Sequence, residues 1–119
     1  MTSNEKDYRE QSAQFWERFR LYNENERREI TKEVHRWAAI YNRYKLTQKA
    51  WQAMFERQNG CCAICGTSQG NLGYTLEIDY DHVTGKVRGL LCRKCNCGIG
   101  MFSEDVENIN KAIRYLEKS

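Results

Sequence analysis

Two Cys-x-x-Cys pairs constrain this 119-residue chain more than any other feature of its sequence. Cys62 and Cys65 form the first pair, Cys92 and Cys95 form the second, and residues 66–91 separate them. Two such pairs can direct four thiolates tetrahedrally at one zinc ion. A zinc ion with four thiolate ligands has no open position, so we expect this metal to hold the fold and not to catalyse.

Redox-active cysteines or a chance cluster in the core are the alternatives to a zinc site. The two remaining cysteines, Cys61 and Cys97, each adjoin a pair member and could in principle replace a ligand, but we interpret them as spare thiols. Removing zinc should unfold the segment between the pairs, because metal binding supplies folding energy that the core of a short chain lacks.

The composition indicates a folded protein that does not enter a membrane. Hydrophobic residues make up 40% and charged residues 29% of the chain, which is too apolar for disorder and too polar for a bilayer. No apolar run approaches the roughly 18 residues of a spanning helix, and the polar start of the chain is not a signal peptide. We therefore expect a cytoplasmic protein, where thiols stay reduced.

The small positive net charge of +3 lies in the N-terminal half of the chain. Residues 1–50 hold eleven Lys or Arg against eight Asp or Glu, whereas residues 51–119 hold eight of each kind. This excess could be a weak footprint for a polyanion, or only a solvated helix surface.

Apolar residues at helical spacing predict helices in the first part of the chain. An apolar stripe runs through residues 12–45 and is interrupted at residues 23–27, so we expect two helices or one bent helix. A short helix should follow from Gln48 to about Gln58, with Thr47 as its N-cap.

The pattern changes between Gly60 and Gly100, where cysteines, glycines and alternating residues replace the helical spacing. We expect strands at residues 74–80 and 86–91, a turn at Thr84-Gly85, and a short helix from Arg93 to residues 98–100. A final helix should begin with Ser103 as its N-cap. The predicted fold class is α+β: a mostly helical small domain, with an N-terminal helical region at 1–46 and a hairpin-helix domain at 47–119.

Polar side chains near the cysteine pairs could carry chemistry. Asp79 lies near the end of the first predicted strand, and His82 follows three residues later. Asn96 comes directly after the second cysteine pair. A carboxylate and an amide oxygen can bind a hard cation such as Mg²⁺, while a histidine activates water. The plainer alternative is a turn that carries a hydrogen-bonded surface histidine.

These segments resemble the phage recombination endonuclease VII family, a group of HNH or ββα-metal nucleases. The resemblance covers roughly residues 46–117. It is carried by residues 58–66, 78–82 and 84–92, by Cys95, Asn96 and Gly100, and by residues 112–116. It implies a zinc-stapled ββα-metal core and a Mg²⁺- or Mn²⁺-dependent endonuclease.

The resemblance also implies roles for individual residues. Asp79 and Asn96 match the ligands of the catalytic metal, and Tyr80 occupies the position of the general base, where the family has histidine. A phenol, with an ordinary pKa near 10, is a poor base at neutral pH. His82 matches the family's second histidine and could activate water in its place. Ile99 is a second departure, because some members carry a metal-binding glutamate there.

Three outcomes follow for catalysis: His82 is the working base, Tyr80 positions water in a slow enzyme, or the chain binds DNA with impaired cleavage. Basic residues around the hairpin could contact phosphates or merely solvate it: Lys86, Arg88, Arg93 and Lys94. The resemblance implies branched DNA, such as a four-way junction in recombination, as substrate, and a homodimer as the assembly. A zinc-ribbon module that binds DNA without cutting it, or an assembly protein that works through its N-terminal helices, are the alternatives.

Overall fold

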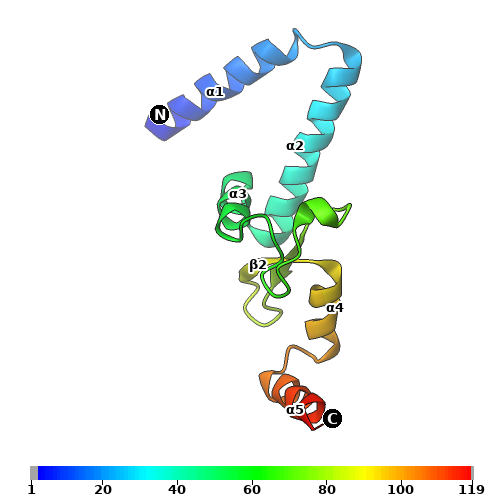
Figure 1. Ribbon diagram of the computed structural model, residues 1–119. Helices are drawn as coiled ribbons and strands as arrows, with labels where there is room; N and C mark the ends of the chain where they lie inside the picture. The colour runs from blue at the N-terminus through cyan, green and yellow to red at the C-terminus, as the bar shows by residue number, and fades with distance from the viewer. Residues whose placement is uncertain (1–2, 119) are drawn as a thin grey trace. The chain divides into compact units, whose positions relative to one another are not determined.

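The computed structural model describes residues 3–118 and divides the chain into two compact units. The first unit ends at Ile40 and the second begins at Tyr41, so the division lies within a helix. Figure 1 shows helices along most of the chain and a single β-hairpin in the second unit. The predicted fold class is confirmed: the domain is mostly helical, with a hairpin followed by a helix and a four-cysteine cluster nearby. The domain boundary at residue 46 stays a prediction.

Two helices, not one bent helix, carry the N-terminal apolar stripe. Helix α1 spans Ser3–Phe19 and helix α2 spans Glu24–Tyr44. The break comes slightly earlier than the sequence predicts, because Asn23 caps α2: its Oδ1 accepts the backbone N–H of Glu26 at 2.9 Å. None of the described helices has the length and apolar character to cross a membrane.

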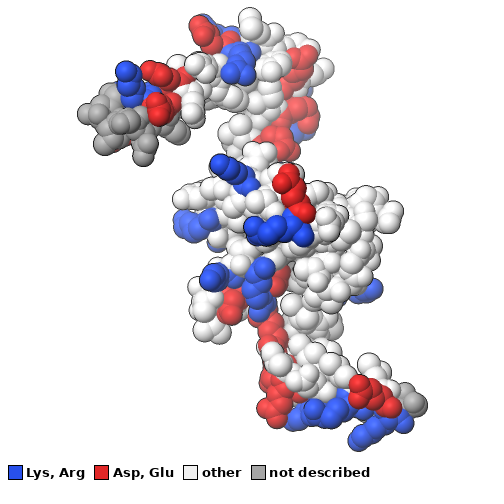
Figure 2. Space-filling view, turned by 60° about the vertical axis from the view of Figure 1, so that its left-hand side comes forward, with Lys and Arg blue, Asp and Glu red and all other residues white. Residues whose placement is uncertain are grey.

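The charges of α2 are arranged as neighbouring pairs of opposite sign. Arg28 contacts Glu24 at 3.0 Å, Lys32 contacts Glu29 at 3.1 Å, and Arg36 contacts Glu33 at 3.6 Å. Figure 2 shows basic and acidic side chains interleaved over the helices. Paired charges at helical spacing are typical of a solvated helix face, so this face gives little support to a polyanion footprint.

Helix α3, Gln48–Arg57, begins at the predicted N-cap, where Thr47 accepts the backbone N–H of Ala50 at 3.1 Å. Trp51 and Met54 turn inward from this helix and are buried. They belong to the small core of the second unit, within which Leu90 is fully buried. Its buried apolar members are Leu46, Trp51, Met54, Cys62, Leu76, Leu90, Leu91 and Cys92.

The hairpin pairs strand β1, Glu77–Tyr80, with strand β2, Val87–Leu91. Strand β1 starts later than predicted, because the backbone N–H of Leu76 bonds the side chain of Gln69 instead of a strand. Gln69 opens the short 3₁₀ turn η1, Gln69–Asn71, just before the hairpin. Asp79 pairs with Gly89, but Tyr80 pairs with Val87, so a bulge lies at Arg88.

Helix α4, Arg93–Met101, follows β2 directly, and helix α5, Val106–Glu117, ends the described chain. The predicted N-cap of α5 at Ser103 is wrong. Ser103 and Glu104 both have φ of 56°, in the left-handed region, and Asp105 accepts the backbone N–H groups of Glu107 and Asn108 instead. This correction gives Glu104 a different role, because its side chain lies beside the hairpin and not in a helix turn.

Candidate active site and metal centre

Four cysteine sulfurs converge beside the hairpin, as the sequence predicts. The Sγ atoms of Cys62, Cys65, Cys92 and Cys95 all lie within 4.8 Å of one another. Cys65 and Cys92, from different pairs, have their sulfurs 3.7 Å apart. A tetrahedron with zinc–sulfur bonds of about 2.3 Å has edges of about 3.8 Å. The spacing is therefore consistent with a structural zinc site.

Backbone and side-chain hydrogen bonds fix the loop that carries the first pair. Gly66 has φ of 75° and donates its backbone N–H to Cys62 at 3.0 Å, which closes the turn between the two cysteines. Ala63 donates its backbone N–H to the carbonyl of Leu90 at 3.1 Å. The side-chain amide of Gln58 donates to the carbonyls of Cys61 and Leu90, both at 2.8 Å, and accepts the N–H of Leu90 at 3.0 Å. The first loop is thereby tied to β2, from which Cys92 follows.

The surroundings of the cluster favour thiolates at two of the four cysteines. The Thr67 hydroxyl, 3.1 Å from Sγ of Cys65, and the Thr67 N–H lower the pKa of Cys65 to about 6. Burial opposes ionisation of Cys62, but the backbone N–H groups of Cys92, Cys65 and Ile64 outweigh it and lower the pKa of Cys62. Burial and the neighbouring sulfurs raise the pKa of Cys95 to about 12. A thiolate at Cys95 is thus disfavoured unless a cation neutralises the cluster.

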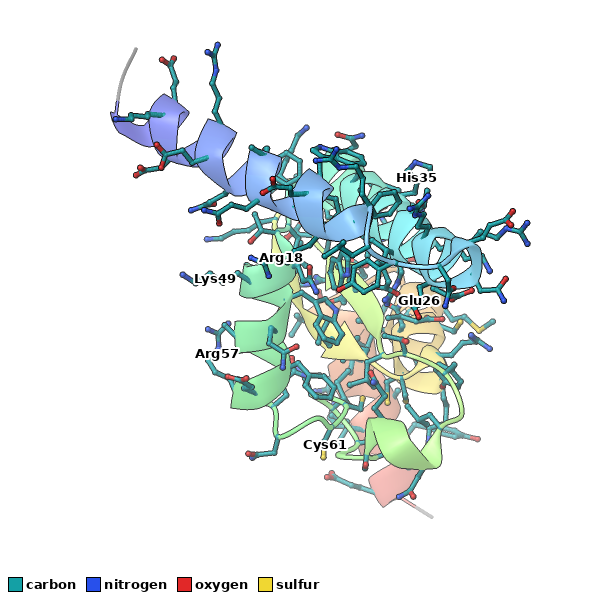
Figure 3. The ribbon with its side chains drawn as sticks, turned by 90° about the horizontal axis from the view of Figure 1, so that it is seen from above. Arg18, Glu26, His35, Lys49, Arg57 and Cys61 are labelled. Carbon is teal, nitrogen blue, oxygen red and sulfur yellow. The ribbon has the colours of Figure 1, made fainter. Side chains whose placement is uncertain are left out.

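The two remaining cysteines lie outside the cluster. Cys61 sits in the loop after α3 (Figure 3), where its thiol donates to the carbonyl of Asn59 at 3.2 Å. Cys97 is exposed on α4. Among the described residues neither belongs to the group that could hold a metal, in agreement with their interpretation as spare thiols.

Asp79 is a buried carboxylate that is held by Arg88. It is 7% exposed, and Arg88 grips both of its oxygens, with Nε 2.8 Å from Oδ2 and Nη2 2.9 Å from Oδ1. The bulge makes this contact possible, because in a regular register Arg88 would face Tyr80 on the other side of the strand. Hydrogen bonds to Asp79 and Glu104 raise the pKa of Arg88. Each carboxylate oxygen of Asp79 keeps a second lone pair that a cation could use.

Asn96 approaches the same strand from helix α4. Its side-chain N–H donates to Oε1 of Glu77 at 3.1 Å, while Oε2 of Glu77 accepts from Nε of Arg93 at 3.0 Å. Glu77 and Asp79 are two residues apart on β1 and so share one strand face. With its N–H turned to Glu77, the amide oxygen of Asn96 is left for another partner, which is the orientation that a metal ligand needs.

His82 lies just after β1, between an aromatic ring and a carboxylate. Its ring centroid is 4.6 Å from that of Tyr80, and its Nε2 is 3.1 Å from Oε1 of Glu104. The other neighbour of Tyr80 is Tyr44, at 5.4 Å between centroids. The structure thus brings Tyr80 and His82 together, as expected of residues on the same side of the hairpin.

Asp81 shapes the turn of the hairpin. Its Oδ1 accepts the backbone N–H groups of Val83 at 2.8 Å and Thr84 at 3.1 Å. The N–H groups of Thr84 and Val83 lower the pKa of Asp81, so the charged form is held in the turn. The turn alternative for this motif therefore fits Asp81 and His82, because Asp81 shapes the turn and His82 is an exposed turn residue, 64% accessible, that pairs with Glu104. Asp79 differs from both, since it is buried and bound by Arg88 from β2.

The four basic residues singled out in the sequence fall into two kinds. Arg88 is engaged with Asp79 and Glu104, and Arg93 pairs with Glu77 and lies 4.3 Å from the ring centroid of Tyr74. Lys86 and Lys94 are exposed, and within the described part of the chain they form no ion pair. The side chains of the two lysines are thus the least engaged of the four.

Sequence reasoning missed two acidic residues of this site, Glu77 and Glu104. Glu77 could have been found from strand alternation, since it stands two residues before Asp79 on the same face. Glu104 gave no such signal, because it reaches the hairpin only through an unusual backbone conformation after α4.

Comparison with known proteins relates the chain to one nuclease family. The sequence profile of the recombination endonuclease VII family matches residues 34–118. The gene 59 protein of Mycobacterium phage D29 is 42% identical over 76 residues, a match that covers 63% of this chain and 46% of that protein. The gene 59 protein of Mycobacterium phage L5 is 39% identical over 74 residues, covering 61% of this chain and 44% of that protein.

The chain spans less than half the length of these curated relatives. The family match is broader, since it extends over both cysteine pairs, the hairpin, α4 and α5. The chain belongs to the recombination endonuclease VII family.

Proposed function

We propose that this chain is a metal-dependent endonuclease that cuts phosphodiester bonds of DNA, with branched DNA of the recombination-junction type as its substrate. One observation carries the proposal: Asn96 reaches from α4 to the face of β1 that also bears Asp79, beside a four-cysteine cluster. Family membership supports the DNA substrate.

Zinc in the four-cysteine cluster is the first part of the proposal. The sulfur spacing of 3.7 Å between Cys65 and Cys92 and the lowered pKa of Cys65 both suit a thiolate-bound cation. With four sulfur ligands, zinc would be structural, holding the loop after α3 against the start of α4.

Mg²⁺ or Mn²⁺ at Asp79 and Asn96 is the second part. The donors here are oxygens of a carboxylate and an amide, the set that hard cations prefer. Such a cation would stabilise the negative charge that develops on the phosphate during cleavage. Arg88 holds the Asp79 carboxylate in place from one side, and Glu77 holds the Asn96 amide.

His82 is the proposed general base. The imidazole side chain suits proton transfer near neutral pH, where a phenol does not. The ring of Tyr80 lies beside it at 4.6 Å between centroids, tilted by 56°. Lys86, Arg93 and Lys94 are the proposed phosphate contacts around the hairpin, whereas Arg88 acts mainly on Asp79.

A DNA-binding module with impaired or no cleavage is the second candidate. One observation favours it: Arg88 donates hydrogen bonds to both carboxylate oxygens of Asp79. A metal ion bound there would have to share these oxygens with the guanidinium. A tyrosine, Tyr80, at the family's base position also favours impaired cleavage, because a phenol is a poor base at neutral pH. Both candidates bind DNA through basic residues, so affinity should fall steeply with salt in either case.

Cleavage separates the two candidates. The zinc-loaded chain is incubated with a four-way junction and with a linear duplex of the same sequence, in Mg²⁺, in Mn²⁺ and in EDTA. The nuclease proposal expects metal-dependent strand cuts, faster on the junction, that Asp79→Ala abolishes and Glu107→Ala, a change at an exposed carboxylate of α5, retains.

Salt-sensitive binding without cuts by the wild-type chain and by Tyr80→His would support the binding module instead. If the chain neither binds nor cuts DNA, the alternative that remains is an assembly protein that works through its N-terminal helices.

A further inference from the structure

We propose that Glu104 is a positioning residue of this site: it fixes the tautomer of His82 so that Nδ1 is the ring nitrogen that takes a proton from water. The inference rests on the proposed nuclease function and deepens it. The same atom of Glu104, Oε1, lies 3.1 Å from Nε2 of His82 and 3.1 Å from Nη2 of Arg88. One carboxylate thus links the candidate base to the arginine that holds Asp79.

The backbone before α5 directs Glu104 to the hairpin. Ser103 and Glu104 both have φ of 56°, a region that side-chain-bearing residues rarely adopt. Their N–H groups close the end of α4, bonding the carbonyls of Gly100 and Ile99, each at 2.9 Å. The side chain of Glu104 is only 18% exposed, whereas that of Glu107 on α5 is 78% exposed. A regular helix start at Ser103 would have placed Glu104 among the solvated acids of α5.

The chemistry follows from the hydrogen-bond inventory of the imidazole ring. A carboxylate only accepts, so the nitrogen that faces it carries the hydrogen. In the neutral ring the other nitrogen then holds the lone pair. With Nε2–H directed at Glu104, Nδ1 becomes the acceptor for water. The Tyr80 ring, 4.6 Å from the ring of His82, gives the imidazole a second neighbour beside Glu104.

Arg88 extends this effect to the metal ligand. Its Nη2 lies 3.1 Å from Glu104, 2.9 Å from Oδ1 of Asp79 and 3.3 Å from the carbonyl of Tyr80. Glu104 therefore partly neutralises the guanidinium that holds Asp79, which leaves the Asp79 carboxylate more of its charge for a cation.

The tautomer can be read directly by NMR of the imidazole nitrogens in the zinc-loaded chain at alkaline pH. The chain has two histidines, and the exposed His35 on α2, labelled in Figure 3, serves as an internal reference. We expect the Nε2–H share of the neutral ring to be higher at His82 than at His35 in the wild type, and Glu104→Gln to lower it to the level of His35 while Glu107→Gln leaves it unchanged. An Nε2–H share at His82 no higher than that at His35 would overturn the inference without any variant.

Cleavage rates supply the second measurement. Glu104→Gln should lower kcat on junction DNA by roughly 10- to 100-fold with little change in KM, as is usual when a supporting partner of a site is lost. Equal kcat for wild type and Glu104→Gln would overturn the inference while the nuclease function stands. Absence of cleavage by the wild-type chain would instead count against the nuclease function, and the NMR result would still decide whether Glu104 sets the tautomer.

Discussion

Two side chains that carry the proposed chemistry, Tyr80 and His82, lie against each other at the end of β1. Their ring centroids are 4.6 Å apart, and Tyr44 flanks Tyr80 at 5.4 Å. The His82 ring also contacts the carboxylate of Glu104, which suits a group that exchanges protons. We propose that Tyr80 contacts the imidazole and does not itself act as the base, although it occupies the family's base position.

Replacing His82 should therefore stop most of the cleavage. We expect His82→Ala to lower the rate by about 100-fold or more, since a general base contributes about 10²- to 10⁴-fold. Tyr80→His in the His82→Ala background should restore part of the rate, because it returns an imidazole to the family's base position. The rates are measured under single-turnover conditions on junction DNA.

His35→Ala is the matched control, because His35 is an exposed histidine on α2. Full activity of His82→Ala would place the base elsewhere.

At the scale of elements, the hairpin depends on a side chain from the end of α3. Gln58 makes three hydrogen bonds to backbone groups, two of them to the fully buried Leu90. Gly89 lies under the same side chain, since a Cβ there would come within 3.2 Å of its Oε1. The amide of Gln58 thus bonds the backbone N–H and C=O of Leu90, as an adjacent strand would. Its bond to the carbonyl of Cys61 joins β2 to the first cysteine loop.

Gln58→Ala should accordingly destabilise the second unit. It leaves the buried N–H of Leu90 without its acceptor, while the carbonyl of Leu90 keeps the N–H of Ala63. A buried group left unbonded costs about 1–3 kcal/mol. Gln52→Ala is the control, because Gln52 is exposed and bonds only Glu56, at 3.3 Å. Urea unfolding of the zinc-loaded variants measures the free energy of unfolding, and equal values would show that Gln58 is dispensable.

Local patterns predicted most elements, and long-range contacts explain where they failed. Helical spacing located α2 and α3, and the Thr47 cap was placed correctly because capping is a local hydrogen bond. The start of α5 was missed because two residues with side chains adopt left-handed backbone there. The bulge at Arg88 was equally unpredictable, since it shows itself only in the pairing with β1.

The same division holds for the candidate site. Spacing alone identified the four clustered cysteines, and residue chemistry beside them, together with the family resemblance, picked out Asp79, Asn96 and His82. Neither indicated that Arg88 would hold Asp79, or that Glu77 and Glu104 would hold Asn96 and His82. Strand alternation places Glu77 on the face of Asp79, but the contacts of Arg88 and Glu104 join different elements, so no local pattern in the sequence contains them.

At the scale of the whole molecule, the fold of the second unit depends on the cysteine cluster. Its core contains few large side chains, and two of its buried apolar residues, Cys62 and Cys92, are members of the cluster. The zinc proposed there would therefore supply much of the folding energy of this unit. Dimerisation of the chain, expected from the family resemblance, stays a prediction.

Loss of one cluster cysteine should unfold the hairpin and α4. We expect Cys92→Ala to lose its zinc and the cooperative thermal transition of the second unit, because structural zinc contributes on the order of 10 kcal/mol in small domains. Cys97→Ala is the control, since Cys97 is exposed and outside the cluster. Metal content is measured by elemental analysis and the melting temperature by circular dichroism. Equal melting temperatures of Cys92→Ala and Cys97→Ala would contradict a structural zinc.

The central claim is that a zinc-held hairpin presents a hard-metal site at Asp79 and Asn96 at which DNA is cut. The most direct measurement titrates Mn²⁺ into the zinc-loaded chain, with bound metal followed by electron paramagnetic resonance and plasmid nicking measured in the same samples. We expect nicking to rise in proportion to a single bound Mn²⁺ in the wild type, and both to be lost in Asp79→Ala. Nicking that survives in Asp79→Ala, or a bound Mn²⁺ that produces no nicking, would contradict the claim.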